Sequence, residues 1–225
     1  MKWASAGLPG AWQTDPTANR TSMHVSWGRS GIVQMTTAGS ARRRARRPDM
    51  SQQDTQTSTV SVVPPGATFD IRRTTPEDAE WMRQVLRRYW ASEQTVSRGT
   101  VKEPLKLPGF AAMRDDEPIG LVTYEITGEA CEIVTHNSMA DSGGIGSCLL
   151  AAVRNEARQR GCKRLWLVTT NDNTPALRFY QRRDFDIVAL HRHAITESRR
   201  LKPEIPDTGL HGIEILHEIE MSYDL

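Results

Sequence analysis

The spacing of apolar and polar positions becomes regular only after residue 67. TFDIRR at 68–73 alternates as a β-strand does, and the segment after it repeats apolar residues at helical spacing. Thr75 stands where a helix N-cap is expected, and Pro76 follows at the first helical position. The apolar side chains of this segment fall on one helical face: Ala79, Met82, Val85, Leu86 and Tyr89. The pattern predicts a strand followed by an amphipathic helix.

The segment 109–136 predicts an antiparallel meander, because the turn signals DDEPIG and TGEA divide it into three apolar runs. The next block, GGIGSCLLAAVRNEARQRGCKRLWLVTT, predicts a helix that ends at Gly161 and leads into a short apolar strand. Strand, crossover helix and strand together make a parallel pair. A second helix and two strands follow, FDIVALHRHAI and EILHEIEMSYDL. We therefore expect an α/β (α+β) fold over 68–225, with a mixed, mostly antiparallel central sheet, helices on both faces and one parallel strand pair.

Residues 1–67 show no sustained period of either kind, and SVVPPGA closes them like a linker. We predict a disordered tail. Met50 opens a more ordinary N-terminus, so residues 1–49 are alternatively an extension from a misassigned start. The run RRRARR at 42–47 is a candidate contact for nucleic acid, but a solvated charge run in a tail is the favoured interpretation.

Composition limits the classes of function. The chain has 225 residues, a net charge of +2 and a mean hydropathy of -0.52. No apolar stretch is long enough to cross a membrane, and the N-terminus lacks the apolar block of a secretory signal, so we expect a cytoplasmic protein with no membrane partner. The three cysteines, Cys131, Cys148 and Cys162, lie in apolar segments without a CxxC pair. They are interpreted as reduced packing residues, not as disulfides or metal ligands.

The segment HNSMADSGGIGSCLL carries the clearest chemistry. A strand passes through a loop of small residues into a helix, so free backbone N–H groups and the positive end of the helix dipole face one point. This arrangement binds phosphate, with Ser142, Gly143, Gly144, Ile145, Gly146 and Ser147 as the candidate residues. A simple turn is the alternative. A dinucleotide-binding fingerprint is disfavoured, because Leu149 holds its third glycine position and the preceding strands look antiparallel.

Two motifs in this order resemble the GNAT superfamily of N-acetyltransferases, which use acetyl-CoA. The family's loop, R/Q-x-x-G-x-G/A, corresponds to Asp141-Ser-Gly-Gly144-Ile-Gly146, and its N-x-x-A-x-x-x-Y-x-x-x-G-F corresponds to Asn173 through Ala176 and Tyr180 to Asp184-Phe185. The likeness extends over 69–225. Asp141 departs from the basic or amide residue of the family and removes a side-chain contact to phosphate. Asp184 replaces a glycine, at small expected cost, because aspartate tolerates the left-handed conformation.

The resemblance implies a role for each site residue. Tyr180 protonates the departing thiolate of CoA, Asn173 binds the pantetheine arm, and the amides of Val134, Thr135 and His136 face the acetyl group. Glu132 is the first choice for the base that receives the amine proton, with His136, Glu125 or a water relay as alternatives. Structural interpretations compete with these roles: a packed tyrosine, an N-cap asparagine and a solvated carboxylate on the strand face.

The resemblance also implies that residues 89–107 and 193–213 form the acceptor pocket. Neither stretch has a clear charge bias, so the acceptor could be a small-molecule amine, an amino acid, an aminoglycoside or a peptide amine. We expect the protein to be a monomer or a homodimer. We expect acetyl-CoA as co-substrate and no metal. Two other classes stay open: an acyl-CoA sensor or partner-binding module without catalysis, motivated by Asp141, and a nucleic-acid-binding protein acting through RRRARR.

Overall fold

The computed structural model describes residues 63–139 and 144–225. The predicted tail up to residue 62, the RRRARR run and the loop residues 140–143 lie outside the described residues. At the start of the described part, Val63 and Ala67 pack against the main core. The end of the predicted linker is therefore in contact with the folded domain. None of the helices in the described part is long and apolar enough to cross a membrane.

Seven strands form the main sheet in the order β1-β4-β5-β6-β7-β9-β8. Their bounds are Asp70–Arg73 (β1), Gly109–Arg114 (β4), Glu117–Thr127 (β5), Ala130–Ser138 (β6), Arg164–Thr170 (β7), Asp186–His191 (β8) and Glu218–Asp224 (β9). Neighbouring strands are antiparallel except β6 and β7, which are parallel. The expected mixed sheet with a meander and one parallel pair is confirmed for the described residues.

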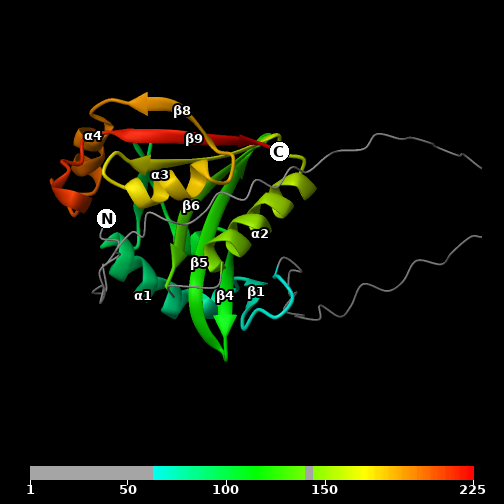
Figure 1. Cartoon of the computed structure of the whole chain (residues 1–225). Helices are drawn as coiled ribbons and strands as arrows, with labels where there is room; N and C mark the ends of the chain where they lie inside the picture. The colour runs from blue at the N-terminus through cyan, green and yellow to red at the C-terminus, as the bar shows by residue number, and fades with distance from the viewer. Residues whose placement is uncertain (1–62, 140–143) are drawn as a thin grey trace, which may run out of the picture. The chain divides into compact units, whose positions relative to one another are not determined.

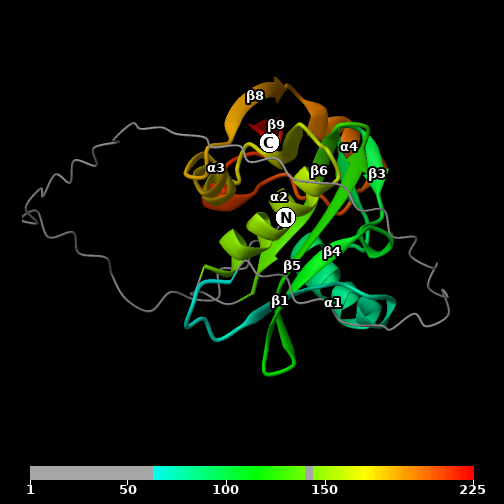
Figure 2. The ribbon, with the colours of Figure 1, turned by 90° about the vertical axis from the view of Figure 1, so that its right-hand side faces the viewer.

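Helices cover both faces of this sheet. They are α1 (Ala79–Trp90), α2 (Ile145–Gln159), α3 (Thr174–Gln181) and α4 (Ala194–Leu201). Figure 1 shows α2 and α3 in front of the sheet, and the side view in Figure 2 places α1 on the opposite face. Alternation along β5 explains the two layers, because Leu121 packs with α1 whereas Val122 belongs to the core under α2.

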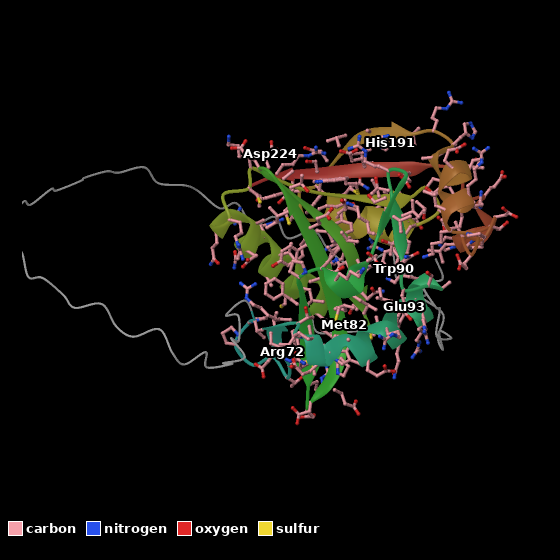
Figure 3. All side chains as sticks on the ribbon, turned by 180° about the vertical axis from the view of Figure 1, so that it is seen from behind. Arg72, Met82, Trp90, Glu93, His191 and Asp224 are labelled. Atoms are coloured by element: carbon pink, nitrogen blue, oxygen red, sulfur yellow. The ribbon has the colours of Figure 1, made fainter. Side chains whose placement is uncertain are left out.

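The chain enters α1 much as predicted, with one correction. Thr75 is the N-cap and Pro76 the first helical residue, but the first turn, Pro76–Asp78, is a 3-10 turn, and the α-helix begins at Ala79. The Asp78 carboxylate accepts a hydrogen bond from the Thr75 backbone N–H at 2.8 Å, which fixes this entry. Figure 3 shows α1 from the other side, with Met82 along its length and Trp90 at its C-terminal end.

Two elements differ from the sequence interpretation. The polar stretch after α1 contains a small antiparallel hairpin, β2 (Thr95–Ser97) with β3 (Thr100–Lys102). The strand predicted for FDIVALHRHAI ends at His191, and the connection to β9 contains the helix α4, which the sequence pattern did not predict. Both elements place residues near the candidate site.

The three cysteines are free and buried, as predicted. Cys131 lies on β6 and Cys148 on α2, and both belong to the main core. Burial raises the pKa of the Cys131 thiol to about 12. These thiols stay protonated, so they act as small apolar packing groups.

Candidate functional site

The parallel pair opens into a gap. Residues Ala130–Glu132 of β6 lie opposite Arg164–Trp166 of β7, and no pairing follows beyond them. β6 continues alongside β5 and β7 alongside β9, so the two strands diverge. β6 also carries a bulge, because Ile133 lies opposite Tyr124 and Thr135 opposite Thr123, which leaves Val134 without an opposite residue. The two strands therefore separate next to 134–136, the residues whose amides are expected to face the acetyl group.

Two pockets meet in this gap. The α3 pocket is bounded by residues 133–137 of β6, residues 167–169 of β7 and three residues of the α3 segment, namely Asn173, Ala176 and Tyr180. The α4 pocket lies toward the β2–β3 hairpin and α4, and it contains Glu132. Both pockets share a set of wall residues: Trp90, Ile133, Val134, Val168 and Thr169. The gap is thus accessible from both pockets.

Tyr180 reaches the gap from α3, with 5% of the residue exposed. Its hydroxyl lies 2.8 Å from His136 Nδ1, and His136 Nε2 lies 3.1 Å from the backbone oxygen of Gly146. A carbonyl oxygen only accepts, so Nε2 carries the hydrogen, and Nδ1 accepts from the Tyr180 hydroxyl. Burial lowers the pKa of His136 to about 4, which keeps the ring neutral.

Burial also raises the pKa of Tyr180 above its usual range. The phenol is therefore a weaker acid than a free tyrosine and stays protonated over the physiological pH range. It remains a hydrogen-bond donor at the wall of the α3 pocket. The packed interpretation is also correct in part, because the ring lies edge-on to Phe179 and Phe185, with centroids 5.1 and 5.2 Å away.

Asn173 is the N-cap of α3. Its side-chain oxygen accepts a hydrogen bond from the Ala176 N–H at 3.3 Å. The predicted capping role is thus confirmed, and Asn173 also lines the α3 pocket, where its amide group has no protein acceptor among the described residues. The role in binding the pantetheine arm that the resemblance implies for Asn173 stays a prediction. Asp184, after the helix, has φ +64°, the left-handed conformation expected where the family pattern has glycine.

The start of α2 has the predicted geometry in its described part. Gly144 is the N-cap with φ +76°, a conformation that favours glycine. The first helical hydrogen bond runs from Cys148 N–H to the Gly144 oxygen, so the N–H groups of Ile145, Gly146 and Ser147 have no helical partner. Ser142 and Gly143 lie outside the described residues.

Packing against α3 also favours glycine at position 146, a reason that sequence analysis did not find. A Cβ atom there would lie 3.3 Å from the Phe179 ring of α3 and 3.5 Å from His136 Nε2. The absence of a side chain lets α2 and α3 approach closely, and this approach places the Gly146 carbonyl against His136.

Glu132 lies in the α4 pocket, and it is 4% exposed rather than solvated on a strand face. It accepts a hydrogen bond from Ser97 Oγ at 2.5 Å and pairs with Lys102 Nζ at 3.0 Å. Lys102 Nζ also pairs with Glu125 at 2.5 Å. These contacts give the buried carboxylate two polar partners, and they bring two of the candidate bases, Glu132 and Glu125, into one network. His136, the third candidate, belongs to the α3 pocket instead.

Sequence analysis missed two charged residues of the α4 pocket. Glu218 is 2% exposed and accepts hydrogen bonds from Ser198 Oγ and the Arg98 N–H, and burial raises its pKa. Lys202 is 5% exposed, donates to the backbone oxygens of Trp90 and Gln94, and has its pKa lowered by burial to about 8. The available signal was weak: Glu218 alternates with apolar residues on the predicted last strand, which only assigns it to a face.

The predicted acceptor ranges both contribute to the α4 pocket. Residues 95–97 come from the first range, and α4 with its following turn supplies Ile195, Ser198, Lys202 and Ile205 from the second. The Thr170 hydroxyl lines the same pocket, and among the described residues it is buried without a hydrogen-bond partner. In residues 63–139 and 144–225, no cluster of His, Cys, Asp or Glu side chains is arranged to hold a metal ion.

Comparison with known proteins agrees with this geometry. The sequence model described as the acetyltransferase (GNAT) family matches residues 70–185. YdhI, an uncharacterised protein of Bacillus subtilis, is 42% identical over 137 residues, which cover 60% of this chain and 85% of YdhI.

Two solved structures share the fold. One is the IAA acetyltransferase from Bacillus cereus, with a TM-score of 0.52 and 18% identity, covering 70% of this chain and 99% of that one. The other is a GNAT family acetyltransferase from Elizabethkingia anophelis with acetyl-CoA bound, with a TM-score of 0.51 and 21% identity, covering 70% of this chain and 99% of that one.

Proposed function

Because this chain belongs to the GNAT family of acetyltransferases, we propose that it transfers the acetyl group of acetyl-CoA directly to a primary amine in a ternary complex. The observation that carries the proposal is the gap between β6 and β7, which joins the α3 pocket to the α4 pocket. Two substrates entering from the two pockets would meet at the stretch of β6 that has no partner on β7.

The α3 pocket is the proposed donor side. The unpaired N–H groups at the start of α2 suit the pyrophosphate of CoA, and the amide group of Asn173 suits the pantetheine arm. Val134, Thr135 and His136 line the same pocket, so their backbone amides are the proposed donors to the thioester oxygen. Ser142 and Gly143 remain predicted phosphate contacts from the sequence pattern.

The chemistry needs two proton transfers. The amine nitrogen attacks the carbonyl carbon of the thioester, the carbon–sulfur bond breaks, the amine loses one proton and the departing sulfur gains one. Tyr180 is the proposed proton donor to sulfur, because it is protonated and lines the donor side. Its hydroxyl turns from His136 Nδ1 toward the sulfur when it donates.

The α4 pocket is the proposed acceptor side, and Glu132 is the proposed base there. Lys102 and Ser97 bond to its carboxylate and hold it in place at the wall of this pocket. His136 is a poorer candidate, since its Nδ1 already accepts from Tyr180. Glu125 is 37% exposed at the mouth of the same network, so it or a water molecule is the alternative relay.

An array of amines tests the proposal. Purified full-length protein is incubated with acetyl-CoA and small amines, amino acids, aminoglycosides or peptides, and the free thiol of CoA is measured. We expect amine-dependent thiol release with at least one class, strongly reduced in Tyr180→Phe but not in Tyr223→Phe, which removes a hydroxyl outside both pockets. Tight acetyl-CoA binding without release for any amine would favour the acyl-CoA sensor.

A further inference from the structure

A cluster of arginines surrounds an open hollow beside α3. Arg178, Arg182 and Arg183 line it from α3 and the turn that follows, and His211 lines it from the segment before β9. No carboxylate is among the described residues that line this hollow. In Figures 1 and 2, α3 lies beside α2 on one face of the sheet. The arginine cluster, defined as Arg178, Arg182 and Arg183, is therefore close to the helix whose start suits phosphate.

The positive charges of this cluster are not compensated within the described part of the chain. Arg178 and Arg182 are exposed, stand four residues apart on one helix face, and form no ion pair with a described residue. Like charges at this spacing destabilise a helix. The helix dipole places about half a negative charge at the C-terminal end of α3, which attracts cations but does not balance two arginines. An anion in the hollow would relieve the remaining repulsion.

Arg183 connects this cluster to the start of α2. Its Nη2 donates to Ser147 Oγ at 2.5 Å, its Nη1 donates to the Phe179 oxygen at 2.8 Å, and its guanidinium stacks 3.6 Å from the Phe179 ring centroid. Burial, and secondarily Arg182, lower the pKa of Arg183. Arg183 is thus held in place by protein contacts, whereas Arg178 and Arg182 keep their donors for a ligand.

The sequence of the phosphate loop also suggests that a positive charge for CoA comes from another element. Asp141 stands where the family pattern has a basic or amide residue, so the loop brings no cation of its own at that position. CoA carries a pyrophosphate and also a phosphate monoester on its ribose. The N–H groups at the start of α2 suit the pyrophosphate, so the dianionic monoester needs another group to balance its charge. Guanidinium groups match such an anion in charge and shape.

We propose that Arg178 and Arg182 bind the 3′-phosphate of CoA, while Arg183, through its hydrogen bond to Ser147, fixes the end of α3 against the first turn of α2. The proposal rests on the proposed function, because it assumes that CoA is the ligand. It assigns to α3 the charge neutralisation that the aspartate-containing loop does not supply.

The test compares CoA with dephospho-CoA, which lacks only the 3′-phosphate. Titration calorimetry of the full-length protein gives the Kd of both ligands for the wild type and for Arg178→Gln/Arg182→Gln. The matched control is Arg158→Gln/Arg192→Gln, which removes two exposed positive charges outside the hollow. Thermal melts verify that each variant is folded.

We expect the wild type and the control to bind CoA on the order of tenfold more tightly than dephospho-CoA. The Arg178→Gln/Arg182→Gln variant should bind both ligands alike, at the wild-type affinity for dephospho-CoA. Equal wild-type affinities for the two ligands, or an equal loss for both ligands in the variant, would overturn the 3′-phosphate assignment and leave the proposed function intact. Failure of the wild type to bind either ligand would instead contradict the proposed function.

Discussion

Tyr180→Phe removes one hydroxyl and keeps the ring with its contacts to Phe179 and Phe185. The hydroxyl is the partner of His136 Nδ1, so the substitution leaves a buried acceptor unpaired. Such a loss typically costs about 1–3 kcal/mol. We therefore expect a measurable decrease in the free energy of unfolding, but a folded protein with little change in its affinity for acetyl-CoA.

The effect on turnover should be separate and larger. Loss of a general acid costs on the order of a hundredfold in rate, which corresponds to about 2.7 kcal/mol in activation free energy. The assay is kcat for the best amine of the array across a pH series, under conditions where the chemical step limits the rate. Urea unfolding of the same samples gives the stability change, and Tyr223→Phe is the control.

Two results would refute this reasoning. An unchanged kcat where chemistry is limiting would remove Tyr180 from the mechanism. A decrease in rate that matches the decrease in folded fraction would show that its role is packing and the hydrogen bond to His136 alone.

Four further substitutions follow from the site. Glu132→Gln should lower kcat/KM for the best amine, because the amide cannot accept the amine proton, whereas an unchanged kcat/KM would exclude Glu132 as the base. Burial lowers the pKa of His136 to about 4, against about 6.5 when unfolded. As pH falls through this interval the unfolded chain binds the proton first, so the free energy of unfolding should decrease. In His136→Leu it should decrease less over the same pH interval, which urea unfolding at a series of pH values measures. Gly144→Val should weaken acetyl-CoA binding in calorimetry, because valine strains a backbone at φ +76° and covers the N–H groups, while Gly146→Val should also lower Tm through contact with Phe179. Unchanged binding in both would contradict the pyrophosphate assignment.

The sheet and its main helices were predictable because their apolar periods are long and clear. Leu149 and Val153 of α2, for example, are fully buried on the face that the spacing predicted. The hairpin β2–β3 has strands of three residues each, too short to show an alternation against polar neighbours. In α4 only Ile195 and Ser198 are buried, so its eight residues look like a loop in sequence.

The residues proposed for the donor side come from a different kind of signal. The glycines belong to one motif, and Asn173 and Tyr180 belong to a second motif at a fixed distance from it, so one sequence is enough to propose them together. The acceptor side is assembled by packing. Lys202 bonds to Trp90, which is 112 residues away in sequence, and no local pattern encodes that contact. The bond between Tyr180 and His136 likewise joins residues 44 apart, and both had been assigned only separate roles.

The most direct test of the account follows the acetyl group itself. Acetyl-CoA labelled in its acetyl group is incubated with the protein and the best amine, and the label is counted in the amine, in the protein and in free acetate. Direct transfer across the gap predicts one labelled amide for each CoA released, with no label on the protein. Label retained on the protein, or released as acetate in place of the amide, would contradict the proposed transfer.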